Sequence, residues 1–363
     1  MPNVTAIIDL KALVHNMELI KSKAPKSKII AIVKANAYGH GLLQAAGALL
    51  ELVDGFGVAR IGEAKVLHEN GFTKPIFLLE GFYNREDVPV ISRFGFVSAI
   101  HDEEQIRMIQ NSKVEKPLEC FLKIDIGMHR LGANPEDVDR LAAMLNDCPQ
   151  VKKPIGLVSH LSVADTPPEF DYNRQQISYF NETAKRFKGP LCLANSAGIM
   201  EWPESHTEYV RPGIIMYGIT PFPNESGADR GLIPVMTLKS TIIALRRVKK
   251  GAKVGYGAAW VAPNDTVVGI IAMGYGDGYP RNAPNGTPVY VNGRLVPTSG
   301  HVCMDMMFVD LGPDSKDRIG DEAVLWGKEL PVERIADLCG TIPYELVCKI
   351  MPRVRFEYIN PYP

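Results

Sequence analysis

Strand-like and helix-like segments alternate along the first three-fifths of this chain, and this alternation constrains the fold more than any other feature. Short apolar runs with β-branched residues are typical of buried strands, and apolar residues at three- and four-residue spacing are typical of amphipathic helices. Eight runs have the strand pattern: 29–33, 55–59, 75–79, 96–100, 118–124, 155–160, 191–194 and 209–211. Helices are expected between them, at 41–53, 61–70, 102–111, 135–145 and 172–187, with a further helix capped by Asp9. Eight alternating units predict an α/β fold, a (β/α)8 barrel of the TIM type.

The pattern changes after Thr220. A loop rich in Pro, Gly and Asn at 221–227 precedes β-rich runs at 235–246, 266–272, 287–291, 307–309 and 323–325. Asn285-Gly286 and Asn292-Gly293 are typical of hairpin turns. Only 332–339 and 343–350 have a helical pattern. We therefore predict a barrel domain over 1–225 and a smaller, mostly β C-terminal domain over 226–363.

Composition narrows the class of protein. The 363 residues carry 40 basic and 41 acidic side chains, interspersed, so no basic block predicts nucleic-acid binding. No apolar run approaches the roughly 20 residues of a membrane span, and the start of the chain lacks the features of a secretion signal. The six cysteines form no C-x-x-C pair, which argues against a zinc site and favours free thiols in a reducing compartment. We expect a cytoplasmic protein with no metal site and no nucleic-acid or membrane partner.

Polar residues gather at the ends of the predicted barrel strands. The residues at or just beyond such ends are Lys34, Lys123, His160, Asn195, Ser196 and Arg211. In a (β/α)8 barrel the carboxyl ends of the strands form the active-site face. Each residue also has a plainer interpretation: Lys34 could reach water, His160 could be a core histidine, and Arg211 could belong to a surface turn. Asn195-Ser196 could be a helix N-cap.

Lys34 is the strongest candidate for chemistry. It enters a segment of small residues, where partial desolvation would lower the pKa of its amine and make it a usable nucleophile or Schiff-base former. The hydroxyl of Ser196 and the backbone N–H groups at 213–214 could form anion cradles. Barrel enzymes often bind phosphate at the loops after the last two strands. A lysine on the first strand and a phosphate cradle on the last two predict pyridoxal phosphate.

Residues 33–41 read Val-Lys-Ala-Asn-Ala-Tyr-Gly-His-Gly, and further motifs lie at 123–132, 160–165, 195–198, 211–218, 254–260, 274–279 and 303–305. Through these motifs, nearly the whole chain resembles the alanine racemase family of barrel-fold pyridoxal-phosphate enzymes. Residues 33–41 match the cofactor-lysine signature of that family. The resemblance implies an isomerase that interconverts L- and D-alanine, for peptidoglycan synthesis or for alanine catabolism.

The resemblance also implies two bases on opposite faces of the substrate, as racemisation requires. Lys34 would hold the cofactor and act on D-alanine. Tyr256 would act on L-alanine, reaching across from the partner subunit of a homodimer. Arg130 would bind the substrate carboxylate, for which a guanidinium is suited, together with the backbone amide of Met304 from the partner.

Cofactor contacts are implied in the same way. Arg211 would face the ring nitrogen without protonating it, which favours racemisation over transamination, and His160 would lie against the ring. The contacts around the phosphate would be Tyr38, Ser196, Gly213, Ile214 and Tyr217. Lys123 matches a lysine that is carbamylated in some members and orients Arg130, and Tyr275 would line the entrance.

Two positions depart from the family pattern. Pro352 stands where some members carry a tyrosine, which affects an entrance contact, and His301 stands where arginine is common. Three other functions are alternatives. A broader amino-acid racemase, acting on serine for instance, would use the same bases. A barrel decarboxylase would need a ring-facing carboxylate in place of Arg211, and a pyridoxal-phosphate carrier would not need Tyr256.

Overall fold

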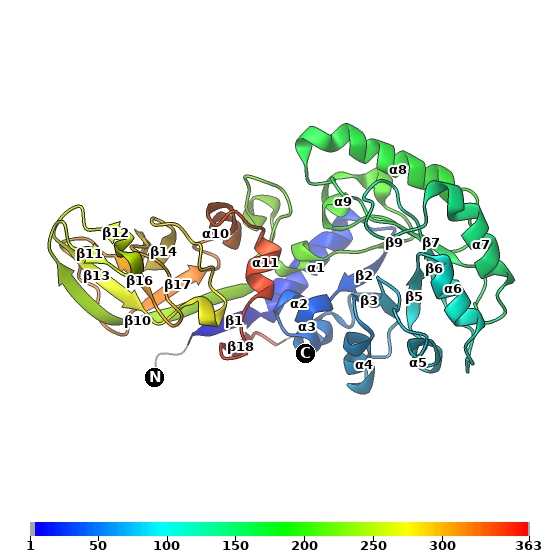
Figure 1. Ribbon diagram of the computed structural model, residues 1–363, viewed down its shortest axis with the longest axis horizontal. Helices are drawn as coiled ribbons and strands as arrows, with labels where there is room; N and C mark the ends of the chain where they lie inside the picture. The colour runs from blue at the N-terminus through cyan, green and yellow to red at the C-terminus, as the bar shows by residue number, and fades with distance from the viewer. Residues whose placement is uncertain (1–3, 362–363) are drawn as a thin grey trace.

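A closed barrel of parallel strands forms the larger part of the molecule (Figure 1). The computed structural model describes residues 4–361. The barrel strands are β2 (Lys28–Ile32), β3 (Gly55–Val58), β4 (Ile76–Leu78), β5 (Val97–Ile100), β6 (Cys120–Lys123), β7 (Gly156–Val158), β8 (Leu191–Cys192) and β9 (Tyr209–Val210). Pairing of β9 with β2, through Lys28–Tyr209 and Ile29–Val210, closes the ring. The predicted (β/α)8 barrel is confirmed.

Helices cover the outside of the barrel (Figure 1). They are α1 (Leu10–Lys23), α3 (Leu42–Leu49), α4 (Ile61–Glu69), α5 (Asp87–Phe94), α6 (Glu103–Gln110), α7 (Val138–Asp147), α8 (Phe170–Ala184) and α9 (Ser196–Glu201). Asp9 caps α1 by accepting from the N–H groups of Lys11 and Ala12, as predicted. Helix α5 was not predicted, since it is short and contains Pro89. Among the helices of residues 4–361, none has the length and apolar character that crossing a membrane requires.

The second part of the molecule is mostly β. Its sheet has the order β15-β14-β17-β10-β1-β18, and β13 pairs with β10 and β16. The strands are β1 (Thr5–Asp9), β10 (Met236–Val248), β13 (Thr266–Ile271), β14 (Pro288–Val291), β15 (Arg294–Pro297), β16 (Met307–Asp310), β17 (Glu322–Trp326) and β18 (Arg355–Ile359), with a separate pair β11 (Lys253–Val254) and β12 (Trp260–Val261). Helices α10 (Val332–Leu338) and α11 (Pro343–Cys348) are both confirmed, and Figure 1 shows α11 between the sheet and the barrel.

The two hairpin predictions have different outcomes. Asn292-Gly293 joins β14 to β15, with Val291 opposite Arg294, as predicted. Asn285-Gly286 lies ahead of β14 and joins no hairpin, so that prediction is wrong. The side chain of Asn285 instead donates to the carbonyl of Ala259 at 2.8 Å and accepts from the N–H of Gly300 at 2.6 Å, which ties three loops together.

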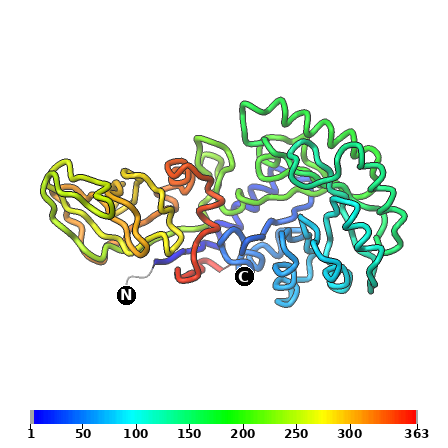
Figure 2. The backbone as a smooth tube through the Cα atoms, in the orientation of Figure 1, coloured from blue at the N-terminus to red at the C-terminus, as the bar shows by residue number. Residues whose placement is uncertain are grey.

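Strand β1 lies in the second sheet, although its residues fall within the range 1–225 that we expected to form the barrel. It pairs antiparallel with β10 and parallel with β18. Figure 2 shows the blue segment of β1 beside the red segment of β18, where these two strands pair. Asp9 is both the last residue of β1 and the N-cap of α1. The chain therefore passes from β1 in one domain to α1 in the other without a linker.

Candidate active site

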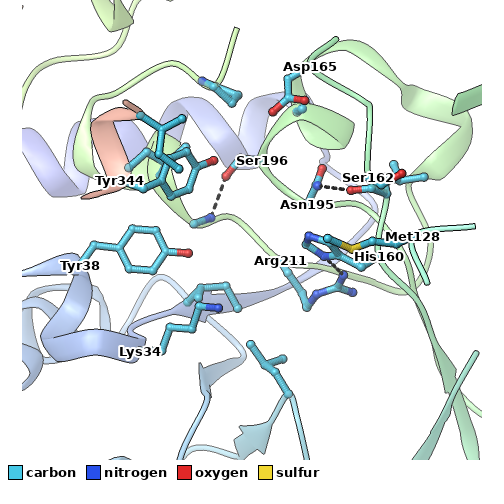
Figure 3. Close-up of a pocket in the computed structure, with 18 of the residues that line it drawn as sticks. Lys34, Tyr38, Met128, His160, Ser162, Asp165, Asn195, Ser196, Arg211 and Tyr344 are labelled. Atoms are coloured by element: carbon cyan, nitrogen blue, oxygen red, sulfur yellow. Dashed lines mark hydrogen bonds between the residues drawn. The ribbon is translucent and has the colours of Figure 1, made fainter. Parts of the chain in front are cut away.

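A cavity of about 530 Å³ opens at the carboxyl ends of the barrel strands. The structure brings together there most of the residues predicted from the sequence. The predicted cofactor and substrate residues that line it are Lys34, Tyr38, Arg130, His160, Ser196, Arg211, Gly213 and Ile214. Figure 3 shows Lys34 and Tyr38 extending into the cavity from one side, with Ser196, Arg211 and His160 across from them.

The chain turns in a left-handed sense immediately after Lys34. In the segment α2 (Lys34–Tyr38), the φ angles of Ala35, Asn36, Ala37 and Tyr38 are 52°, 55°, 53° and 52°. Each such residue costs roughly 1–2 kcal/mol because Cβ approaches the following carbonyl oxygen. Contacts hold the turn in place: the carboxylate of Glu63 accepts from the N–H of Ala35 at 2.6 Å. Backbone strain of this kind persists only where the surrounding structure imposes it, often at functional sites.

Two lysines in the cavity have lowered pKa values. Burial lowers the pKa of Lys34, and the nearby charge of Arg130 acts in the same direction, while Glu80 partly offsets both. Burial also lowers the pKa of Lys123 to about 8, with further contributions from Arg211 and Arg130. The neutral amine of Lys34 is therefore more available than that of an exposed lysine, as the sequence predicted.

Arg211 is buried and anchored on several sides. Its guanidinium donates to the carbonyl oxygens of Ser159 at 2.7 Å and Leu193 at 3.1 Å, and to the sulfur of Cys192 at 2.9 Å. The Nδ1 atom of His160 lies 3.4 Å from the same guanidinium. Burial, with the charge of Arg211 next, holds the pKa of His160 well below its usual value, so this imidazole is neutral. Arg211 is thus a fixed cation, and His160 is an uncharged neighbour.

A group of donors surrounds Gly213. The hydroxyl oxygen of Ser196 accepts from the N–H of Gly213 at 2.9 Å. A Cβ at Gly213 would lie 3.0 Å from the hydroxyl oxygen of Tyr38 and 3.6 Å from that of Ser196. The missing side chain therefore leaves room between two hydroxyls and the backbone, an arrangement that suits an oxyanion such as phosphate.

Two more tyrosines belong to this region. Tyr217 does not line the cavity; its hydroxyl donates to the carbonyl of Ile32 at 2.9 Å, and its ring lies 5.2 Å from that of Tyr38. Tyr344, on α11, does line the cavity, with its ring 5.8 Å from that of Tyr38. Sequence analysis missed Tyr344 because its segment had only a helical pattern, and nothing local indicated that this helix would reach the barrel.

Tyr256 and Met304 do not lie in the cavity. Their exposed fractions are 71% and 53%. Tyr256 follows β11 in a turn between Gly255 and Gly257, both with positive φ. Tyr275, also exposed, donates its N–H to the carbonyl of Cys303 at 3.0 Å and so lies beside the loop that carries Met304. One chain therefore presents these side chains on the surface of the second domain.

Arg353 fixes the loops around Met304. It pairs with Asp277 at 2.7 Å and with Asp305 at 2.8 Å, and so joins the loop of Tyr275 to that of Met304. The two residues that depart from the family pattern, His301 and Pro352, are exposed next to these loops. Large exposed side chains held on ordered loops are typical of an interaction site.

Comparison with known proteins assigns both halves of the chain to one family. Residues 8–221 match the family described as alanine racemase, N-terminal domain, and residues 235–358 match alanine racemase, C-terminal domain. The alanine racemase of Mannheimia succiniciproducens is 52% identical over 99% of this chain and 100% of its own length. That of Vibrio parahaemolyticus is 53% identical over 97% and 98%. The crystal structure of the biosynthetic alanine racemase from Pseudomonas aeruginosa superposes with a TM-score of 0.95 at 39% identity, covering 99% of this chain and 100% of that one.

Proposed function

This chain belongs to the alanine racemase family, and on that premise we propose that it interconverts L- and D-alanine with pyridoxal phosphate in the barrel cavity and with one base from each of two subunits. The observation that carries the proposal is the cavity itself. It combines a lysine of lowered pKa, an anion cradle and a buried arginine within one space. The same site residues were expected from the sequence.

The residues present fit pyridoxal phosphate. The hydroxyls of Tyr38 and Ser196, with the backbone at Gly213, suit the phosphate, and the space that a Cβ would fill is open. The amine of Lys34 suits the aldehyde, and the guanidinium of Arg211 suits a ring nitrogen that must accept a hydrogen bond. When bound, the cofactor supplies an electron sink that makes the Cα proton of alanine removable.

The chain's own residues then move one proton on each face. For L-alanine, the Tyr256 oxygen takes the proton from one face and the Lys34 nitrogen returns a proton to the other; D-alanine uses the reverse order. The lowered pKa of Lys34 makes its nitrogen a better donor than an ordinary lysine, since its proton leaves more readily. Arg130 lines the cavity with Lys34, which supports a role in binding the substrate carboxylate, with the Met304 amide added from the partner.

A homodimer is part of the proposal. The exposed Tyr256 and Met304 of one chain would complete the cavity of a second copy, and the second copy would do the same in return. We place this dimer in the cytoplasm, where D-alanine would serve peptidoglycan synthesis or alanine catabolism.

Chiral analysis tests the reaction class. Purified protein with pyridoxal phosphate should convert either enantiomer of alanine to a racemic mixture. A decarboxylated amine, or no inversion, would contradict the proposal. Arg211 argues against a decarboxylase, because a carboxylate would be needed at that position. Comparing kcat/KM for alanine and serine measures how broad the substrate range is.

Replacement of the second base gives a sharper test. With Tyr256→Phe, deuterium exchange at Cα of L-alanine should fall more than that of D-alanine, because Lys34 still serves the D face. Equal loss for both enantiomers would refute the assignment of one base to each face.

A further inference from the structure

His40 is the most deeply buried histidine near Lys34, and it has no role in the proposed reaction. Its exposed fraction is 0%. Its Nδ1 atom lies 2.9 Å from the carbonyl oxygen of Tyr38 and 3.1 Å from that of Ala37. Both carbonyls belong to the left-handed turn that follows Lys34. His40 therefore contacts the turn at the end opposite Glu63, which holds the N–H of Ala35.

The hydrogen-bond partners determine which nitrogen of His40 carries the proton. Carbonyl oxygens only accept, so Nδ1 is the N–H nitrogen and Nε2 carries the lone pair. Among the residues that the structure describes, Nε2 has no hydrogen-bond partner. Burial lowers the pKa of His40 to about 4, so the ring stays neutral in this tautomer near neutral pH.

Tyr217 connects His40 to the strand that delivers Lys34. The two rings are stacked, with centroids 4.5 Å apart and an angle of 23° between their planes. The hydroxyl of Tyr217 donates to the carbonyl of Ile32, two residues before Lys34. His40 and Tyr217 thus form one packed unit that holds the backbone on both sides of Lys34.

We propose that His40 is a positioning residue: its Nδ1–H, bonded to the carbonyls of Ala37 and Tyr38, holds the left-handed turn in the conformation that directs Lys34 and Tyr38 into the cavity. Without that donor, the Tyr38 carbonyl would lose its side-chain partner and the Ala37 carbonyl would keep only the backbone N–H of His40 at 3.0 Å, so the strained turn would relax toward right-handed or extended angles. The amine of Lys34 and the hydroxyl of Tyr38 would then leave their shared orientation. This inference rests on the proposed function for its consequence in cofactor binding.

Two variants whose new side chains have nearly the same shape, Asn and Leu, separate the effect of losing the hydrogen-bond donor from the effect of losing the ring. The amide nitrogen of Asn branches from Cγ, as Nδ1 does, so His40→Asn keeps a donor in place, whereas His40→Leu removes it. When pyridoxal phosphate is added to His40→Leu apoprotein, its attachment to Lys34, measured by absorbance, should be at least about tenfold slower than in wild type. The kcat of this variant should also fall by a larger factor than its KM changes. His40→Asn should restore both to within about threefold of wild type.

Hydrogen–deuterium exchange gives a readout that needs no cofactor. The peptide covering residues 34–41 should exchange faster in His40→Leu apoprotein than in wild type, with His40→Asn close to wild type. If His40→Leu does not fold, His40→Gln takes its place, since its amide nitrogen lies one bond further out and cannot reach both carbonyls. Equal exchange and equal cofactor attachment in the Leu or Gln variant and wild type would overturn the positioning role. Equal defects in the Asn and Leu variants would overturn the role of the donor.

These outcomes are distinct from a failure of the proposed function. If wild type took up no pyridoxal phosphate or inverted no alanine, the proposed function would fail, while the exchange comparison would still decide how His40 acts on the turn.

Discussion

Gly213 shows how a single missing side chain shapes the cavity. Its backbone N–H donates to Ser196, and the space in front of it is bounded by the hydroxyls of Ser196 and Tyr38. A methyl group there would lie 3.0 Å from the Tyr38 oxygen, closer than ordinary van der Waals contact, and would fill the cradle. The space for an anion beside Gly213 therefore depends on the missing side chain as well as on the neighbouring hydroxyl groups.

Gly213→Ala should weaken pyridoxal-phosphate binding at least about tenfold, or ~1.4 kcal/mol, because the new methyl occupies the space for the phosphate. Titration of apoprotein, followed by absorbance, measures this change. Gly47→Ala is the matched control: Gly47 lies in α3, with nothing near its added Cβ, and binding should not change. Unaltered binding in Gly213→Ala would show that the phosphate does not bind beside Gly213.

The protonation of His40 leads to a prediction about pH. Its pKa is lowered by burial to about 4, whereas a free imidazole titrates near ~6.5. The unfolded chain therefore binds a proton that the folded chain excludes. The contribution of neutral His40 to the free energy of unfolding is fully present above pH ~6.5. It is lost as the pH falls toward 4, at up to ~1.4 kcal/mol per pH unit.

His40→Asn cannot titrate, so the decrease in its urea midpoint between pH 7 and pH 5 should be smaller than that of wild type. His160, whose pKa is also lowered, contributes to both profiles alike. Parallel profiles for the two proteins would show that His40 titrates normally in the folded state.

At the scale of elements, α1 supports the segment that carries the cradle. Asn16 on α1 is fully buried. Its amide donates to the carbonyls of Met216 at 3.0 Å and Ile233 at 2.8 Å, and its oxygen accepts from the N–H of Ile233 at 2.8 Å. Met216 lies in the 3-10 turn Ile214–Tyr217 that follows Gly213. One side chain thus joins three segments behind the cavity.

Asn16→Ala should lower the free energy of unfolding by roughly 1–3 kcal/mol, because it leaves buried backbone groups without partners. Urea denaturation followed by circular dichroism measures this. Asn181→Ala, on the exposed side of α8, removes one bond of 3.3 Å to the carbonyl of Glu204 and should change stability by less than about 0.5 kcal/mol. Equal effects of the two substitutions would refute the supporting role of Asn16.

At the scale of the whole molecule, the two proposed bases lie in different domains of one chain. Lys34 lines the cavity, and Tyr256 is on the surface of the second domain. Strand β1 pairs with β10 in that domain and leads directly into α1 of the barrel, so the two domains are joined through Asp9.

Mixing two inactive variants tests whether the site is shared. In a hybrid of Lys34→Ala and Tyr256→Phe chains, one cavity would have both bases and the other neither. Dissociation and random reassociation of equal amounts should therefore restore about one quarter of wild-type activity. Each variant treated alone is the control. No recovery, with hybrid dimers shown by mass spectrometry, would place both bases on one chain.

Much of the fold was predictable because its signals are local. The spacing of apolar residues predicts strands and helices wherever one face is buried, and this was sufficient for eight barrel strands and both C-terminal helices. Asp9 acted as the predicted N-cap, since a cap needs only the next three residues. The segment around Lys34 identified the cavity through its resemblance to a family.

The tertiary structure decided those features that depend on contacts with residues far away in the sequence. No glycine precedes Gly39 in the left-handed turn, so sequence propensity alone opposes it, and contacts from Glu63 and His40 accompany it. The pairing of β1 with the second sheet and the arrival of Tyr344 in the cavity join residues hundreds of positions apart. Local propensity is a sum of small preferences, whereas these features are set by packing and buried hydrogen bonds, which exist only once the chain has folded.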